Sequence, residues 1–294
     1  MKTKRQLFYG ESSLKFYTRE DIIRGKIIKI NPAIITILDK LNKSMDVNLI
    51  QEKVLAEAEI LLKQGNIYTL HVDINFEDYS NFPSNGPAIN SHIFNVDFIE
   101  RLNRLSESYS AFLNIHLLTD YPKRHIQDIK HIKVGAICFQ LEVVKNSKEL
   151  SEIIDEIMEA GACASPVIEV IGTEKFIPGT KQQVLKFISP FQDKIGMLTF
   201  QVETTGARSN NALGMLASNE AADYIDFFVN NFEGTIQIQG GITTKTISSA
   251  IKLGCEFLVC GTEIFNNKSG YSSTEVIENM LEQSEKILLS GTQK

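Results

Sequence analysis

The amino-acid sequence predicts a (β/α)8 barrel, on the strength of three observations. The chain has 294 residues, of which 43% are hydrophobic, and this length fits either two ordinary domains or one α/β barrel. After residue 26, short apolar runs alternate regularly with amphipathic segments, which is the pattern of βαβ units in a parallel sheet. Eight such pairs follow one another, which favours a closed barrel over two domains.

Each predicted strand is an apolar run that precedes a helix-like segment. In residues 47–66, for example, apolar residues recur at three- and four-residue spacing until the pattern ends at Gly65. The first four runs are KIIKINPAII (26–35), YTLHVDI (68–74), FLNIHLL (112–118) and AICFQLE (136–142). The second four are SPVIEVI (165–171), IGMLTFQVE (195–203), TIQIQ (235–239) and EFLVC (256–260).

Two segments stand apart from this alternation. Residues 1–26 are predicted as an N-terminal extension, a strand or arm ahead of a single barrel domain of residues 27–294. Their apolar aromatic residues indicate packing against the barrel or against a second copy, so a homo-oligomer stays open. Residues 75–95 form a long polar connection after the second strand, and such loops often serve as lids or binding loops.

Composition narrows the partners and the compartment. A net charge of -6, without a long run of Lys or Arg, predicts no nucleic-acid partner and no acidic membrane surface, although a small anionic substrate remains compatible. No apolar stretch approaches the roughly 20 residues of a membrane span, and no signal-peptide pattern opens the chain. The four cysteines lack a Cys-x-x-Cys pairing and lie mostly in apolar runs. We therefore expect a cytoplasmic protein.

The active site of a (β/α)8 barrel lies at the C-terminal ends of its strands. His71 and Asp73 lie near the end of the second predicted strand, on one side of it because side chains alternate, and His116 lies on the next strand. Two imidazoles and a carboxylate are a suitable ligand set for Zn, Fe or Mn. The same spacing also suits interior histidines that are hydrogen-bonded to neighbours, so both interpretations stay open.

Glycine turns close the last two predicted strands. Gly240-Gly241 follows the seventh and Gly261-Thr262 the eighth, where many barrels bind phosphate through backbone N–H groups. Glycine lets the backbone approach the phosphate oxygens. The alternative is that these residues only turn the chain. We favour a phosphate site, because both turns lie on the last two strands.

The strand ends resemble, in order, those of the ribulose-phosphate 3-epimerase family over about residues 30–267. This resemblance implies a metal-dependent barrel that acts on a phosphorylated sugar. It implies metal ligands at His71, Asp73, His116 and Gln239, and a phosphate site at the two glycine turns. The matching segments are Pro32-Ala33, residues 71–75 (HVDIN), 114–118 (NIHLL), 139–142 (FQLE), 203–206 (ETTG), Gln239-Gly240-Gly241 and Gly261-Thr262.

Departures from the family pattern bear on the chemistry. In the family two aspartates exchange a proton on opposite faces of the substrate and help to bind the metal. Asp73 keeps the first position, but Gln239 stands at the second, and an amide takes no proton from carbon near neutral pH. The loss of one negative charge predicts a weakened divalent-metal site, or none. Residues that differ at positions of substrate contact in the family are Ala33, Asn75, Leu118 and Gln140.

Two functional hypotheses follow. The first is a sugar-phosphate epimerase- or isomerase-like enzyme with Asp73 as base, with Glu142 or Glu203 as candidate second acid and Arg208 as a phosphate contact. The second is a catalytically degenerate barrel that binds a sugar phosphate as a sensor or supports a partner protein. The missing aspartate motivates the second hypothesis, and the retained Asp73, histidines and glycine turns favour the first.

Overall fold

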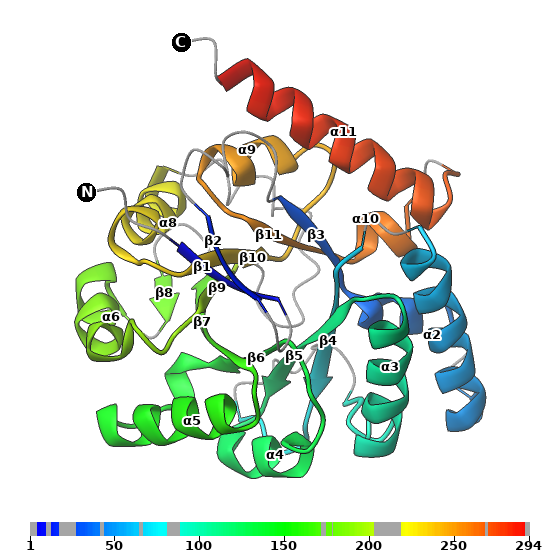
Figure 1. Ribbon diagram of the computed structural model, residues 1–294, viewed down its shortest axis with the longest axis horizontal. Coiled ribbons are helices and arrows are strands. Elements are labelled where there is room, and N and C mark those ends of the chain that lie inside the picture. The colour runs from blue at the N-terminus through cyan, green and yellow to red at the C-terminus, as the bar shows by residue number, and fades with distance from the viewer. Residues whose placement is uncertain are drawn as a thin grey trace.

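The computed structural model describes residues 5–9, 13–17, 28–41, 44–64, 67–80, 89–171, 175–177, 179–202, 219–267 and 270–291. Within these residues, eight parallel strands form a ring with helices outside it (Figure 1). Their order is β3-β11-β10-β9-β7-β6-β5-β4, and a bridge between Ala33 and His71 joins the two ends. The predicted (β/α)8 barrel is therefore confirmed.

All eight predicted strands are present, with ends displaced by a few residues. The first is shorter than predicted, because a 3-10 helix, η2 (Ile34–Lys40), follows it at once. The fifth is longer, and it pairs with an additional antiparallel strand, β8 (Lys175–Ile177). The barrel strands are β3 (Lys29–Pro32), β4 (Thr69–Asn75), β5 (Phe112–Leu118), β6 (Ala136–Gln140), β7 (Cys163–Ile171), β9 (Met197–Gln201), β10 (Thr235–Gln239) and β11 (Phe257–Cys260).

The helices cover the outside of the barrel, and several begin at side-chain caps. Asn95 and Asn146 cap α3 and α5, and Thr180 forms a capping box with Gln183 at α6. Short turns of helix, η3 (Leu141–Val143), η4 (Ser189–Phe191) and α10 (Thr262–Phe265), complete the connections. The longer helices are α2 (Val47–Leu62), α3 (Val96–Ser108), α4 (Pro122–Ile129), α5 (Ser147–Glu159), α6 (Lys181–Ile188), α8 (Asn219–Asn231), α9 (Ile247–Lys252) and α11 (Ser273–Gly291).

The interior of the barrel is largely polar, whereas the layer between strands and helices is aliphatic and aromatic. Asn114 Nδ2 donates to Gln237 Oε1 (2.7 Å), and Gln237 Nε2 donates to Thr199 Oγ1 (3.0 Å). Ser165 shares a hydrogen bond of 2.7 Å with Thr199, and the Cys138 thiol donates to Asn114 Oδ1. Because these buried groups hydrogen-bond one another across five strands, they form a rigid polar layer beneath the C-terminal strand ends.

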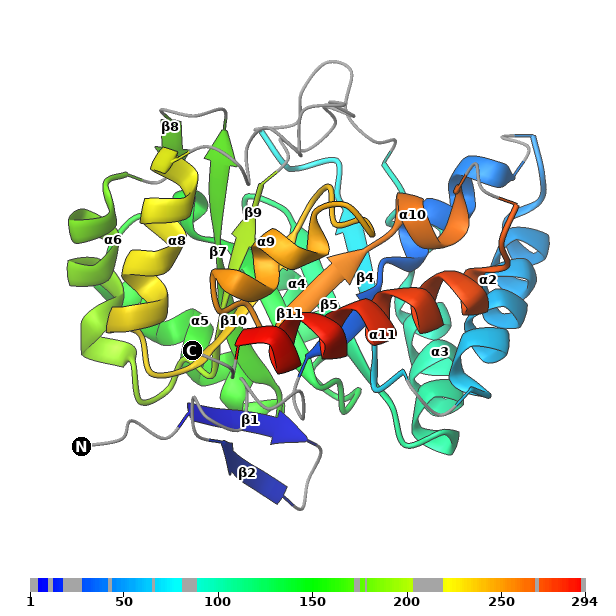
Figure 2. The ribbon, with the colours of Figure 1, turned by 90° about the horizontal axis from the view of Figure 1, so that it is seen from above.

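The N-terminal segment contains an antiparallel hairpin of β1 (Arg5–Tyr9) and β2 (Ser13–Tyr17). Figure 2 shows it at the N-terminal ends of the barrel strands, opposite the ends that carry the predicted site. The aromatic side chains of this segment lie outside the described part of the structure, so their packing stays a prediction. None of the described helices is both long enough and apolar enough to span a bilayer.

Candidate active site at the barrel mouth

Strands β4 and β5 bring His71, Asp73 and His116 together. Parallel pairing places Asp73 opposite His116, and alternation turns His71 to the same face as Asp73. Asp73 Oδ1 lies 3.2 Å from His71 Nε2 and 2.9 Å from His116 Nδ1. One ligand atom from each residue lies within 4.8 Å of the others. Three of the four residues that are predicted as metal ligands thus form one cluster.

The cluster is buried except at its carboxylate. Both imidazole side chains are fully buried, whereas the Asp73 side chain is 17% exposed. Burial acts to raise the pKa of Asp73, but the facing charge of His71 and the hydrogen bonds from both histidines outweigh it, so the pKa lies well below its usual value. Asp73 is therefore ionised, the form in which a carboxylate binds a cation or accepts a proton.

Gln239 ends β10 and faces the same cluster. Its Nε2 lies 3.2 Å from His116 Nδ1, and its buried Oε1 has no hydrogen-bond partner among the described residues. A buried acceptor without a partner is costly, and half a turn of the amide exchanges its oxygen and nitrogen. The oxygen can therefore face the cluster, and two imidazoles, a carboxylate and an amide oxygen form a donor set that fits a divalent cation.

Gln140, the last residue of β6, contacts His116 from the other side. Its Oε1 lies 3.1 Å from His116 Nε2, and its Nε2 donates to Tyr79 Oη (3.1 Å) and Glu142 Oε1 (3.2 Å). The Tyr79 hydroxyl donates to Glu142 Oε1 at 2.8 Å, and burial raises the pKa of Glu142. Substrate contact by Gln140 stays a prediction, while its amide is engaged by protein groups.

Sequence reasoning missed two residues at the mouth. Tyr79 is buried and lies in the predicted binding loop after β4. An aromatic residue within a polar loop was the sequence signal that could have indicated its burial. Glu169 is a buried carboxylate on β7, in register with Gln201 on β9, which pairs with Gln239 on β10. Alternation places all three toward the interior, so Glu169 belongs to the same rim.

The predicted substrate-contact positions lie around the cluster. Ala33 forms the bridge to His71 that joins β3 to β4, and Asn75 pairs with Leu118 at the last residues of β4 and β5. All three are buried. Glu203 and Arg208, which the sequence suggested as a second acid and a phosphate contact, lie outside the described residues.

The two glycine turns lie on neighbouring strands and are tied together. Thr244 Oγ1, after the first turn, donates to Glu263 Oε1, after the second, at 2.9 Å. Gly240 and Gly241 have φ angles of 96° and 62°, which favour glycine. Gly261 has an ordinary φ, but a Cβ there would lie 2.5 Å from Thr36 Cγ2. The two turns of the predicted phosphate site are thus adjacent, and the carboxylate of Glu263 lies beside them.

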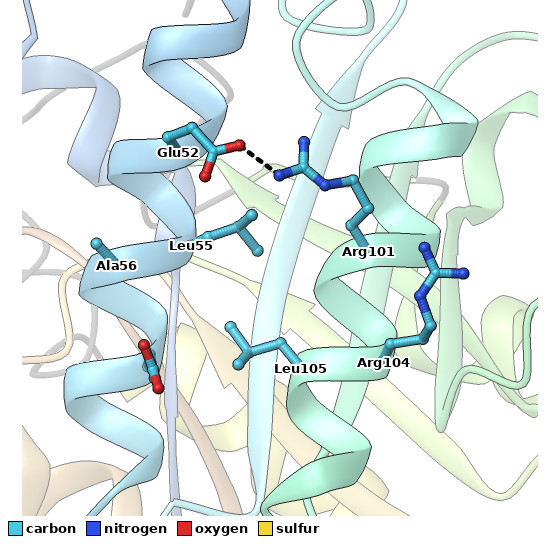
Figure 3. Close-up of a pocket in the computed structure, with 7 residues that line it drawn as sticks. Glu52, Leu55, Ala56, Arg101, Arg104 and Leu105 are labelled. Atoms are coloured by element: carbon cyan, nitrogen blue, oxygen red, sulfur yellow. Dashed lines mark hydrogen bonds and ion pairs between the residues drawn. The ribbon is translucent and has the colours of Figure 1, made fainter.

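A groove on the outer surface lies away from this mouth, between α2 and α3 (Figure 3). Leu55 and Leu105 line it, and an ion pair between Glu52 and Arg101 spans it. Its other charged residues, Glu59 and Arg104, form ion pairs with Lys63 and Glu100, four residues away along the chain. The groove is therefore a contact between neighbouring helices and contains none of the predicted site residues.

Comparisons with known proteins indicate one family. The ribulose-phosphate 3 epimerase family model matches residues 56–265. Ribulose-phosphate 3-epimerase of Schizosaccharomyces pombe is 22% identical over 210 residues, which cover 71% of this chain and 79% of that protein. The enzyme of the same name from Candida glabrata is 26% identical, covering 61% and 64%. The structure of 3-hexulose-6-phosphate synthase from Salmonella typhimurium shares the fold, with a TM-score of 0.52, 12% identity and coverage of 90% and 99%.

Proposed function

Since the chain belongs to the ribulose-phosphate 3-epimerase family, we propose that it is an epimerase- or isomerase-like enzyme that moves a proton beside the carbonyl of a phosphorylated sugar. The observation that carries the proposal is the cluster of His71, Asp73 and His116 at the C-terminal ends of β4 and β5. Active sites of (β/α)8 barrels lie at this end, and the Asp73 carboxylate is the partly exposed group of the cluster.

Each residue of the cluster has a role in the proposal. Asp73 removes and returns the proton on one face of the substrate. His71, Asp73, His116 and the oxygen of Gln239 hold a divalent cation, Zn, Fe or Mn. Bound there, the cation supplies Lewis-acid stabilisation of the negative charge that develops on the substrate oxygens. The neutral amide of Gln239 makes this site weaker than one with a second carboxylate.

The phosphate of the substrate binds at the glycine turns in this proposal. Gly240, Gly241, Gly261 and Thr262 lie at the ends of the adjacent strands β10 and β11, and the three glycines have no Cβ that would keep an anion from the backbone N–H groups. The hydrogen bond between Thr244 and Glu263 supports a fixed distance between the two turns. A sugar phosphate would then extend from these turns toward Asp73.

Gln239 restricts the reaction to one face. Because an amide neither accepts nor returns a proton from carbon, a single base suits proton exchange or isomerisation between adjacent carbons through a cis-enediol. Epimerisation needs a second acid on the opposite face. Two carboxylates near the mouth are candidates for this acid. Glu142 is hydrogen-bonded to Tyr79 and Gln140, whereas Glu169 lies on the rim, in register with Gln201 beside Gln239.

The glutamine at position 239 also favours a second function, the binding of a ligand without catalysis. A barrel that has lost one of two catalytic carboxylates can retain its phosphate turns and bind a sugar phosphate as a sensor or as part of a complex. Turnover distinguishes the two proposals, since both require ligand binding.

Incubation with ribulose 5-phosphate and a divalent metal in deuterated water tests the enzymatic proposal. We expect deuterium to enter at C3 without accumulation of xylulose 5-phosphate, because one base exchanges the proton on one face. Proton NMR of the recovered sugar measures both the deuterium content at C3 and the amount of xylulose 5-phosphate. The isosteric variant Asp73→Asn, assayed at saturating metal, should lose the exchange. Absence of exchange in the wild type would contradict the enzyme and leave the binding protein.

A further inference from the structure

The amide of Gln140 connects the predicted metal cluster to a second buried polar group. Gln140 and His116 are fully buried, and Tyr79 is nearly so. On one side of the amide, Oε1 lies 3.1 Å from His116 Nε2. On the other, Nε2 donates to Tyr79 Oη at 3.1 Å and to Glu142 Oε1 at 3.2 Å. Every polar atom of this side chain therefore has a partner.

The partners decide which way the amide points. The Tyr79 hydroxyl gives its hydrogen to Glu142 Oε1, so its oxygen accepts from Gln140, as the carboxylate oxygen does. Reversing the amide would set its carbonyl oxygen 3.2 Å from a carboxylate oxygen, with no hydrogen between them. The carbonyl oxygen of Gln140 therefore faces His116.

The orientation of Gln140 in turn fixes the ring of His116. A carbonyl oxygen only accepts, so Nε2 of His116 must carry the hydrogen between them. The other ring nitrogen, Nδ1, lies 2.9 Å from Asp73 Oδ1 and 3.2 Å from Gln239 Nε2, so it is the nitrogen that faces the cluster. A cation bound in the cluster would accept the lone pair of Nδ1 in place of the hydrogen bond between Nδ1 and Asp73. The ring is thus set for coordination through Nδ1.

We propose that Gln140, oriented by Glu142 and Tyr79, is a positioning residue that presents Nδ1 of His116 to a divalent metal. The inference rests on the proposed function, because it presupposes a metal at the cluster. It assigns a task to Gln140 at the end of β6, Glu142 in η3 and Tyr79 in the loop after β4, none of which is a predicted metal ligand. Metal-binding histidines commonly depend on such an acceptor at the second ring nitrogen.

Zinc affinity, measured by competition with a chromophoric chelator, tests the inference. We expect Gln140→Met, which keeps the length of the side chain but removes its polar atoms, to bind zinc about 10- to 100-fold more weakly than the wild type. Gln51→Met is the matched control. Gln51 is a buried glutamine on α2 whose Nε2 donates to the backbone oxygen of Ile93 at 2.8 Å, so its loss removes a buried amide away from the barrel mouth.

Two variants of Glu142 separate positioning from packing. Glu142→Gln keeps an oxygen that accepts from Gln140 and should retain nearly wild-type zinc affinity. Glu142→Leu removes that acceptor, frees the amide of Gln140 to rotate and should weaken zinc binding. Far-UV circular dichroism establishes that each variant is folded. Equal affinities for Glu142→Leu and Glu142→Gln would overturn the role of Glu142 as the group that orients the amide.

Nitrogen-15 NMR of the zinc-loaded wild type supplies a readout that packing alone does not change. We expect His116 to show a protonated Nε2 and a coordinated Nδ1. Coordination through Nε2, or unchanged zinc affinity in Gln140→Met, would overturn the inference while the metal site stands. Failure of the wild type to bind zinc would contradict the metal site itself, and the inference with it.

Discussion

At Gln239 a carboxamide occupies the position at which the resemblance to the family implies a proton-transferring aspartate. The side chain keeps its place against His116, and its buried oxygen has no partner among the described residues. The side chain differs from that of an aspartate by an amide nitrogen in place of an oxygen and by one methylene group. The change removes a proton acceptor and a negative charge, while it retains an oxygen that can approach a cation.

Gln239→Asp should restore the negative charge and the proton acceptor that the amide lacks. We expect zinc binding to tighten on the order of tenfold, because a carboxylate attracts a divalent cation where an amide offers only a dipole, and burial of the new charge offsets part of the Coulomb energy. With ribulose 5-phosphate, the variant should also form xylulose 5-phosphate. Isothermal titration and an NMR assay of the product measure the two effects.

Gln239→Asn is the control for this substitution, since it shortens the side chain equally without adding a charge. It should bind zinc no more tightly than the wild type and should form no xylulose 5-phosphate. If Gln239→Asn gained as much as Gln239→Asp, side-chain length rather than charge would explain the result.

At the scale of elements, the glycine turns after β10 and β11 need glycine for different reasons. Gly240 and Gly241 adopt left-handed backbone angles that residues with a Cβ rarely adopt. Gly261 allows close packing of the β11 end against η2, where Thr36 and Ala33 leave no room for a methyl group. The second glycine turn therefore has a structural requirement that holds with or without a bound phosphate.

Gly261→Ala should destabilise the fold by about 1–3 kcal/mol, the usual cost of forcing a methyl group into a packed site. The new Cβ would lie 2.5 Å from Thr36 Cγ2 and 3.3 Å from Ala33 Cβ. Urea unfolding measures the loss. Thr36→Ser removes the obstructing methyl group and keeps the hydroxyl that donates to the backbone oxygen of Ala33.

The double variant Gly261→Ala/Thr36→Ser should therefore be more stable than the sum of the two single effects predicts, because the two positions are in contact. Strict additivity in urea unfolding would show that the close approach at Gly261 is relieved elsewhere. Thr36→Ser alone serves as the reference for the loss of the methyl group.

At the scale of the whole molecule, the candidate site joins parts of the barrel that are distant in the chain. The cluster lies on β4 and β5, Gln239 faces it from β10, and the glycine turns follow β10 and β11, while β3 closes the ring against β4. A metal and a sugar phosphate bound at this rim would connect strands from both halves of the chain. Binding should consequently stabilise the whole barrel against unfolding.

Thermal melts with ribulose 5-phosphate and zinc, manganese or iron measure this coupling. A ligand at a hundredfold its dissociation constant should add about 2.7 kcal/mol of stability, and a chelator should remove the part due to the metal. His71→Ala should lose the metal-dependent part and keep the response to inorganic phosphate at the glycine turns. An unchanged metal response in His71→Ala would place the ion elsewhere, and stabilisation without turnover would favour the binding protein.

The sequence alone determined the barrel architecture and the strands that carry the predicted site residues. Eight apolar runs separated by helical patterns specify a parallel barrel, because each pattern arises from local alternation. The placement of His71 beside Asp73 followed from the same periodicity, and His116 from the order of the strands. Strand ends were predicted less well, since η2 and the β7–β8 hairpin depend on packing rather than on periodicity.

Only the tertiary structure decided the hydrogen bonds between strands. Whether Gln140 faces substrate or His116, and which way its amide points, depends on Tyr79 and Glu142, which meet it only once the barrel is closed. The same holds for the oxygen of Gln239, which has no partner in the described part of the chain, and for the close approach that keeps residue 261 a glycine. Periodicity fixes which face a side chain takes, but its partners across the barrel are set by register and closure, which no local pattern contains.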